Sequence, residues 1–402
     1  MKLIPKALFV VFVAASLFRT ALLAGQSLEI RVAPSDVIYT NQNNRRTGIY
    51  DIMVQTISVI NNSDRSVTLE EILIEVVEEG DVILTDRLLA KNYEPVWKAF
   101  YPYYSNPETQ KSDNSLVLFS EVLPEGVTVS PTLTLGPNTA ILVRNRLLAL
   151  SGYLLPDTVR VSATLADAAG KLETAETSLP VVRYEARNEF IFPLRGRWYV
   201  SSSSSIRSHH RARPAHEFAL DLMKIGEGGR SFRTDGSSPE DYYAFGKDVL
   251  AIADGTVIAA EKEIAETEMP KTGEARGDFA RRVLGAMWEQ DPTGRIAGGN
   301  YVVIEHQGAE YSVYVHMRHN SVTVVPGDKV KQGQVIGQVG ISGDGFEPHL
   351  HFSVTNTPDM NYGHGLPITF TNVKPVGLSS TIDMNVNRLF LTGEFVDASD
   401  PP

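Results

Sequence analysis

The sequence predicts a mainly β protein built from two β-rich parts that meet near residue 187. Through the first part, short apolar runs alternate with polar turn residues. The second part has strand-like runs punctuated by glycine and contains all nine histidines, eight of them between His209 and His351 inclusive. Regularly spaced short strands of this kind are typical of antiparallel sheets. At 402 residues the chain is long enough for each part to bury a core of its own.

The extreme N-terminus has the layout of a secretory signal over residues 1–25. It begins with Lys2 and Lys6, continues with an apolar run over residues 7–18 and ends in small residues around Ala24. An uncleaved anchor is the alternative, but Arg19 ends the run well short of the roughly 20 apolar residues that a membrane span needs. We therefore expect cleavage close to Ala24 and export to the periplasm or the extracellular space.

Residues 27–186 are expected to form a β-sandwich, immunoglobulin-like domain. The strand candidates include YDIMVQTISVI, VTLEEILIEVV and NTAILVRNRLLAL, which are separated by polar turn segments. The sequence of this part contains no cluster of titratable residues that resembles a site. A spacer or docking module is one interpretation, and a ligand-binding domain is the other.

The cysteine content and the net charge exclude several kinds of site and partner. The chain has no cysteine, which excludes disulfides, thiolate zinc sites and a cysteine nucleophile, so a metal must be held by His, Asp or Glu. The formal charge is −11, and without the first 25 residues it becomes −14, from 34 basic and 48 acidic residues. This acidic balance gives no general attraction to nucleic acid, so we expect no nucleic-acid partner.

Two histidines stand one residue apart in the run EPHLHFSV. Because side chains alternate along a strand, His349 and His351 share one face, and Leu350 and Phe352 share the other. An exposed polar edge strand would have the same pattern. Only partner residues elsewhere in the chain can therefore distinguish a functional site from an exposed edge strand.

Two other segments offer such partners. HEFALDLM contains His216 and Asp221, and YSVYVHM contains His316. Zinc hydrolases usually use three protein ligands and keep one position for water. His216, Asp221 and one histidine of the pair would satisfy that number, and the remaining histidines could then manage protons and developing charge.

Five segments, in this order, resemble the catalytic domain of the lysostaphin-type (LytM-like) zinc metallopeptidases. They are DVLAIADGTVIAAE, GGNYVVIEH, YSVYVHM, PGDKVKQGQVIGQVGISG and PHLHF. The resemblance implies an antiparallel β-sheet groove domain over residues 187–375, followed by a C-terminal extension over residues 376–402. It also implies one Zn²⁺ per chain and an endopeptidase that cuts peptidoglycan cross-links, with peptidoglycan stem peptides as substrate. An envelope protein partner would then contact the first domain.

The resemblance also implies roles for five residues. It makes His216, Asp221 and His351 the zinc ligands. It makes His349 the general acid/base, with His316 as its partner in stabilising the transition state.

One departure from the family motif concerns the first ligand. The motif places this histidine four residues before the aspartate, whereas His216 lies five before Asp221 and Glu217 holds the fourth position. Residues five apart in a regular strand face opposite ways. Either a β-bulge realigns His216, or Glu217, His209 or His210 is the ligand.

Two insertions interrupt the second part, over residues 224–246 and 262–299. In the second insertion, five apolar residues at helical spacing predict an amphipathic helix: Phe279, Val283, Leu284, Met287 and Trp288. The helix either docks on the core or forms a lid over the groove. Of the remaining histidines, we expect His306 to end a strand and both His319 and His364 to be solvated.

Two other functions compete with the peptidase. One is a non-catalytic envelope protein that activates or scaffolds another cell-wall hydrolase. Catalytically inactive relatives typically lack metal ligands, however, and this sequence keeps them. The other is a biotinyl or lipoyl carrier, because GDKVKQGQVIGQV resembles the repeat of those domains. A carrier function would leave the histidines unexplained. The sequence also has no lysine in a suitable hairpin motif for the attachment of the cofactor. Zinc content distinguishes the peptidase from both.

Overall fold

The computed structural model describes most of the chain. The described residues are 27–44, 49–107, 122–151, 155–204, 208–271, 273–290, 295–360, 362–376, 389–390 and 392–399. The predicted signal, residues 1–25, lies outside them. Among the described residues, no helix is both long enough and apolar enough to cross a membrane.

The first part of the chain forms two sheets. The first sheet has the order β1-β4-β9-β7, with β3 also paired to β4. Its strands are β1 (Leu28–Ala33), β3 (Asn41–Asn44), β4 (Ile49–Asn61), β7 (Thr128–Val129) and β9 (Thr139–Ser151). The second sheet has the order β2-β11-β10-β5-β6, with β8 also paired to β5. Its strands are β2 (Ile38–Tyr39), β5 (Val67–Glu78), β6 (Asp81–Leu89), β8 (Thr134–Leu135), β10 (Thr158–Asp167) and β11 (Leu172–Val182).

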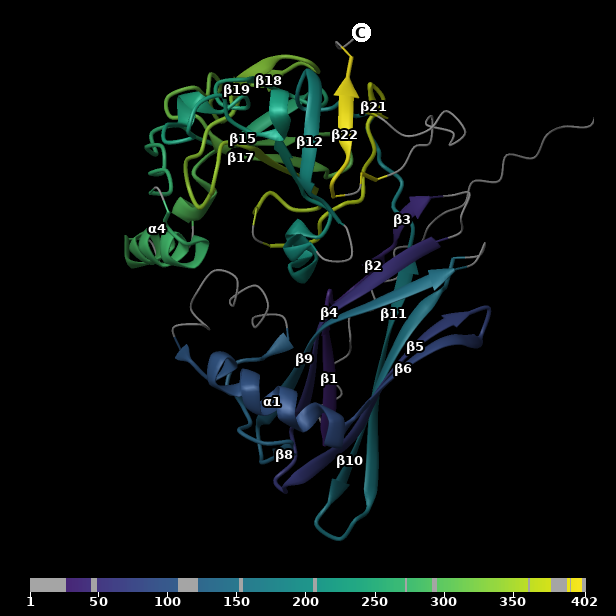
Figure 1. Ribbon diagram of the computed structural model, residues 1–402. Coiled ribbons are helices and arrows are strands. Elements are labelled where there is room, and N and C mark those ends of the chain that lie inside the picture. The colour runs from purple at the N-terminus through teal and green to yellow at the C-terminus, as the bar shows by residue number, and fades with distance from the viewer. Residues whose placement is uncertain are drawn as a thin grey trace, which may run out of the picture.

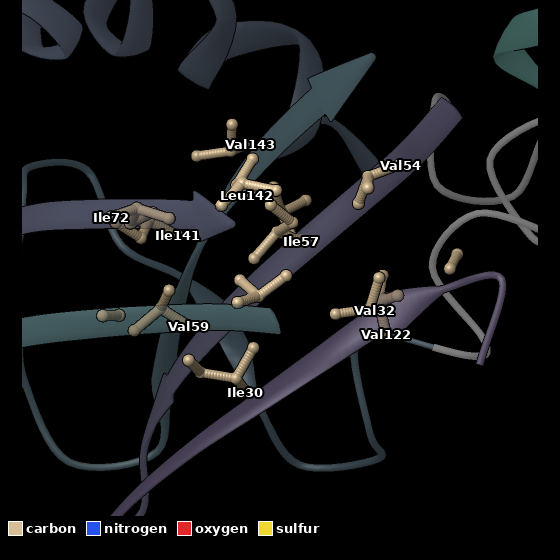
Figure 2. Close-up of a cluster of buried hydrophobic side chains, with 14 of the residues drawn as sticks. Ile30, Val32, Val54, Ile57, Val59, Ile72, Val122, Ile141, Leu142 and Val143 are labelled. Carbon is tan, nitrogen blue, oxygen red and sulfur yellow. The ribbon is translucent and has the colours of Figure 1, made fainter. Parts of the chain in front are cut away.

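One apolar core joins these two sheets. Along β10 every second residue is buried, as expected for a strand with one face against a core. Val59 of β4 and Ile72 of β5 belong to the same buried cluster, which Figure 2 shows from close by. The helix α1 (Ala90–Tyr104) adds the fully buried Trp97, whose indole donates to the Ser130 carbonyl at 3.1 Å. The first part is thus β-rich with two sheets on one core, as predicted, and its immunoglobulin-like classification stays a prediction.

The second part is built on one antiparallel sheet of nine strands, in the order β18-β15-β16-β17-β20-β13-β12-β22-β21. The strands are β12 (Gly196–Ser202), β13 (Leu220–Met223), β15 (Gly255–Glu261), β16 (Asn300–Glu305), β17 (Tyr311–Met317), β18 (Lys329–Val330), β20 (Leu350–Thr355), β21 (Val373–Val376) and β22 (Phe395–Ala398). A separate pair is formed by β14 (Asp248–Leu250) and β19 (Val335–Gln338). The mainly β, antiparallel fold is confirmed.

Part of the segment expected to be a C-terminal extension belongs to this sheet. The strand β22 lies between β12 and β21, and Val396 pairs with Trp198. Both side chains are buried in the core of the second part. The physical reason is apolar burial, because β22 covers the edge that β12 would otherwise expose.

Among the described residues of the second part, the helices are α4 (Arg276–Gln290) and five 3-10 turns: η1 (His209–Ala212), η2 (Pro214–His216), η3 (Glu227–Gly229), η4 (Pro239–Asp241) and η5 (Arg295–Gly298). The helix predicted within the second insertion is confirmed as α4. Its Phe279 is buried against Phe346, with ring centroids 5.3 Å apart. This contact ties the helix to the loop before β20, and its function as a lid stays a prediction.

The two parts of the chain contact each other directly (Figure 1). Tyr39 of β2 packs edge-on against His364 of the second part, with ring centroids 6.2 Å apart. His364 is buried, and its Nε2 lies 2.8 Å from the Asp36 carboxylate of the first part. The expectation that His364 is solvated was therefore wrong, because an acidic partner from the other domain covers it. His319 is exposed, as expected.

Candidate metal and catalytic site

Strand register brings an aspartate and a histidine face to face. In the sheet, His351 of β20 lies directly opposite Asp221 of β13. Directly opposed residues share a face, with their Cβ atoms about 4.5–5.5 Å apart. The His351 Nδ1 atom accordingly lies 2.8 Å from Asp221 Oδ1. His349, just before β20, approaches the same carboxylate, with its Nε2 3.8 Å from Oδ1.

His316 approaches from the neighbouring strand. It lies next to Val315, which is opposite His351, and its backbone φ is +60°. A positive φ is uncommon for a residue other than glycine and concentrates at functional sites. Its ring lies beside that of His349, with centroids 4.8 Å apart, and its Nδ1 is 2.8 Å from the Ser342 carbonyl oxygen. Asp344, which the sequence reasoning missed, lies 3.6 Å from the His316 Nε2.

The turn η1 brings a further histidine to Asp221. The Ser208 hydroxyl caps this turn by accepting from the His210 backbone N–H at 3.2 Å. His210 is buried, with its Nδ1 3.1 Å from the Ala219 carbonyl oxygen and its Nε2 3.2 Å from Asp221 Oδ2. Its ring centroid is 4.9 Å from that of His351. The carboxylate therefore has one imidazole on each side.

His216 does not lie on a strand. It ends the turn η2, four residues before β13 begins. The rule that residues five apart in a strand face opposite ways therefore does not apply to His216 and Asp221, and no β-bulge is needed. Its ring centroid lies 5.0 Å from that of His351. The structure thus brings His216, His349, His316 and His351 together around Asp221. The assignment of His216 as a zinc ligand stays a prediction.

Glu217, one of the alternatives for the first ligand, has other partners. Its Oε1 accepts from Arg211 Nη2 and its Oε2 accepts from Gln55 Nε2, each at 3.1 Å. Both carboxylate oxygens are therefore engaged inside the contact between the two domains. These contacts give Glu217 a role in the contact between the domains and favour a histidine as the first ligand.

The donor set fits a divalent metal ion. A carbonyl oxygen only accepts, so His210 Nδ1 carries a proton, and in the neutral imidazole Nε2 then presents a lone pair. This buried Nε2 has no hydrogen-bond partner among the described residues, yet it faces the Asp221 carboxylate. A lone pair and a carboxylate that face each other without a proton are stabilised by a cation, and neutral imidazole with carboxylate is a donor set that zinc uses. Ligand atoms of His209, His210 and Asp221 lie within 4.8 Å of one another.

The protonation states also suit metal binding. Burial alone would raise the pKa of Asp221, but the adjacent imidazoles of His210 and His351 hold it well below its usual range. Burial lowers the pKa of His351, although its contact with Asp221 works in the opposite direction. Burial and the neighbouring His349 lower the pKa of His316 to about 3. These shifts favour an ionised Asp221 and neutral imidazoles at His316 and His351, the forms that bind metals.

Gly299 packs against the peptide that orients His316. Its φ is +64°, and a Cβ atom there would lie 2.3 Å from the Ser342 carbonyl oxygen. Gly299→Ala is expected to lower the free energy of unfolding by at least about 1–3 kcal/mol, because it adds a clash to an unfavourable φ. Urea unfolding measures the change. Gly273→Ala is the matched control, since its φ is +76° but a Cβ atom meets nothing within 4 Å. Equal losses for the two variants would contradict the importance of the close approach.

The comparison with known families agrees with this geometry. Residues 282–362 match the model for peptidase family M23. His316, His349 and His351 lie within this stretch, whereas Asp221 and the histidines of residues 208–217 lie before it. The chain contains a domain of peptidase family M23. The lysostaphin-type resemblance is therefore confirmed.

Two curated relatives of this M23 domain are endopeptidases by name. Over 92 residues the chain is 37% identical to glycyl-glycine endopeptidase ALE-1 of Staphylococcus capitis, which covers 22% of this chain and 25% of ALE-1. Over 54 residues it is 43% identical to peptidoglycan DD-endopeptidase ShyC of Vibrio cholerae, which covers 13% of this chain and 12% of ShyC. The matched stretches span a quarter or less of these relatives.

Solved structures were compared as well. The lysostaphin catalytic domain from Staphylococcus simulans aligns with 42% of this chain and 88% of its own, at 18% identity and a TM-score of 0.23. The M23 metalloprotease pseudoalterin aligns with 51% of this chain and 91% of its own, at 16% identity and a TM-score of 0.27.

Proposed function

We propose that the protein is a zinc-dependent endopeptidase that hydrolyses peptide bonds in peptidoglycan cross-links. The observation that carries the proposal is the partly buried Asp221 carboxylate between the imidazoles of His210 and His351, with His316 and His349 close to it. The M23 family match and the relatives named as endopeptidases support the reaction and the substrate class.

Asp221 and His351 would hold the zinc ion together with a histidine from residues 208–217. When bound, zinc supplies Lewis-acid activation of a water molecule and of the scissile carbonyl group. The contacts favour His210 as the third ligand, because its Nε2 faces Asp221 Oδ2 at 3.2 Å. His216, the ligand expected from the sequence, lies close enough to compete.

His349 and His316 would manage protons. The His349 Nδ1 lies 2.8 Å from the Glu347 carbonyl oxygen, and the His316 Nδ1 contacts the Ser342 carbonyl in the same way. Both Nδ1 atoms therefore donate, and both Nε2 atoms are left as proton acceptors. An imidazole in this tautomer can take a proton from the attacking water at Nε2 and return it to the leaving amine.

The choice of third ligand can be tested by zinc stoichiometry. His210→Ala is expected to lose zinc, because it removes the nitrogen that faces Asp221, whereas His216→Ala is expected to retain it. Elemental analysis of each purified variant after dialysis against a low zinc concentration gives the answer, with circular dichroism as the check on folding. The opposite pattern would return the role to His216. Zinc retained in both variants would point to His209.

The function itself is tested by digestion. Purified peptidoglycan incubated with the zinc-loaded protein should release fragments with new amino termini, and mass spectrometry should show the cut within the stem peptides or their cross-links. Asp221→Ala is the control, since it should release none. A folded, zinc-loaded protein that leaves peptidoglycan from several species intact would favour the non-catalytic envelope protein.

Export is part of the proposal, because peptidoglycan lies outside the cytoplasm. The secretory layout of residues 1–25 and the absence of cysteine are both consistent with it. The first domain would then face the envelope, where it could contact a protein partner. Cell fractionation should find the mature chain outside the cytoplasm.

A further inference from the structure

A buried cluster of charges joins the first domain to the segment that carries the candidate ligands. Arg211 of η1 is fully buried and pairs with two carboxylates, Asp51 of β4 and Glu217. Asp51 and Glu217 are themselves almost completely buried. Arg211 also donates to the Ser204 carbonyl oxygen at 3.1 Å. A charged group is found in such a place only when its partners satisfy it.

Two more side chains of the first domain reach the same segment. Gln55 shares a face of β4 with Asp51, because the two are four residues apart on a strand. Its Nε2 donates to Glu217 Oε2 at 3.1 Å. From the adjacent strand β9, Arg144 Nη2 donates to the Ala212 carbonyl oxygen at 3.4 Å. Three side chains from one sheet therefore hold a single short segment of the second part.

These contacts lie next to the proposed ligands in the sequence. Arg211 follows His210, and Glu217 follows His216. Both candidates for the third ligand are thus adjacent to a residue fixed by the first domain. We infer that Asp51 is a positioning residue for the metal site, so that the first domain completes the site instead of serving only as a spacer. This inference rests on the proposed function.

The segment needs such support because its own structure is slight. Residues 208–217 contain only two 3-10 turns, of four and three residues, and 3-10 turns have poorer hydrogen-bond geometry than α-helices. Asp221 and His351, in contrast, are fixed by the paired strands of the sheet. A metal site requires its ligands to be held within about 0.5 Å of their working positions. The side chains from β4 and β9 provide this constraint for the third ligand.

The charge count predicts that the fold survives without Asp51. The cluster contains one cation and two carboxylates, so Arg211 keeps Glu217 as a partner when Asp51 is removed. The remaining pair of Arg211 and Glu217 lies within the second part. What is lost is the bond to β4, so we expect the position of η1 to be affected more than the stability of the protein.

The experiment measures zinc affinity in the full-length mature protein. Asp51→Ala is expected to weaken zinc binding by about 10–100-fold, the usual loss when a residue that orients a metal ligand is removed. Competition with a chromophoric chelator gives the dissociation constant, and the visible absorption of the Co²⁺-substituted protein reports the ligand geometry. Asp51→Glu, which restores the charge, should recover part of the affinity.

A matched control separates positioning from general damage to the first domain. Asp86→Asn removes an ion pair with Arg146 that lies within the first domain, between β6 and β9. It should leave the zinc affinity and the Co²⁺ spectrum unchanged. Hydrogen exchange in the metal-free protein provides a second readout, because Asp51→Ala should speed exchange in residues 208–217 and Asp86→Asn should not.

The outcomes distinguish this inference from the proposed function. If the wild-type protein binds no zinc, the proposed function fails. If the wild-type protein binds zinc and a folded Asp51→Ala variant binds it equally well, with the same Co²⁺ spectrum and exchange rates, the positioning role of Asp51 is wrong. Weaker binding with a changed spectrum, and no change in Asp86→Asn, supports the role.

Discussion

Zinc binding is expected to be lost when His351 is replaced by alanine. His351 is held opposite Asp221 by the pairing of β20 with β13, and its Nδ1 lies 2.8 Å from Asp221 Oδ1. Removing one of three protein ligands weakens metal affinity outright, since two protein ligands are too few to hold the ion firmly. Elemental analysis after dialysis should show a fall from about one zinc per chain to almost none.

The control for this variant is another histidine of the same domain. His319 is exposed and follows β17, and its Nδ1 is 3.1 Å from the Ile264 carbonyl oxygen. His319→Ala should keep its zinc and its activity. A folded His351→Ala variant that retains a full equivalent of zinc would remove His351 from the ligand set.

His349→Ala is expected to keep zinc and lose activity. Its Nε2 is 3.8 Å from Asp221 Oδ1, farther than the His351 nitrogen, and its Nδ1 is occupied by the Glu347 carbonyl. Removing a general acid/base typically lowers the rate by about 10²–10⁴-fold. The measurement compares the hydrolysis rate of peptidoglycan with zinc content for the same preparation.

The two variants together define the roles of the pair. If His349→Ala loses zinc while His351→Ala keeps it, the two assignments are reversed. If both variants hydrolyse peptidoglycan at the wild-type rate, the site described here is not the catalytic one.

Much of the fold could be predicted because buried residues recur at the period of a strand or of a helix. The period of two along β10 and the helical spacing around Phe279 both identify the element and its buried face. The strand β22 was harder to place, since a run of four residues has no distinctive period. Its position follows from long-range packing, where Val396 is buried with Trp198.

The parts of the candidate site that lie on strands could be predicted from the alternation of side chains, whereas the parts that lie on turns could not. His349 and His351 had to share a face, and Asp221 lies directly opposite the second of them. The place of His210 depends on the turn η1, whose path no periodic pattern encodes. The pair of Arg211 with Asp51 joins residues 160 positions apart, so nothing local in the sequence indicates it.

The most direct test of this account is the zinc content of the purified mature protein. Elemental analysis after dialysis against a low zinc concentration should find about one equivalent per chain, and Asp221→Ala should contain almost none. A folded wild-type protein that takes up no more zinc than Asp221→Ala would contradict the metallopeptidase site at its centre.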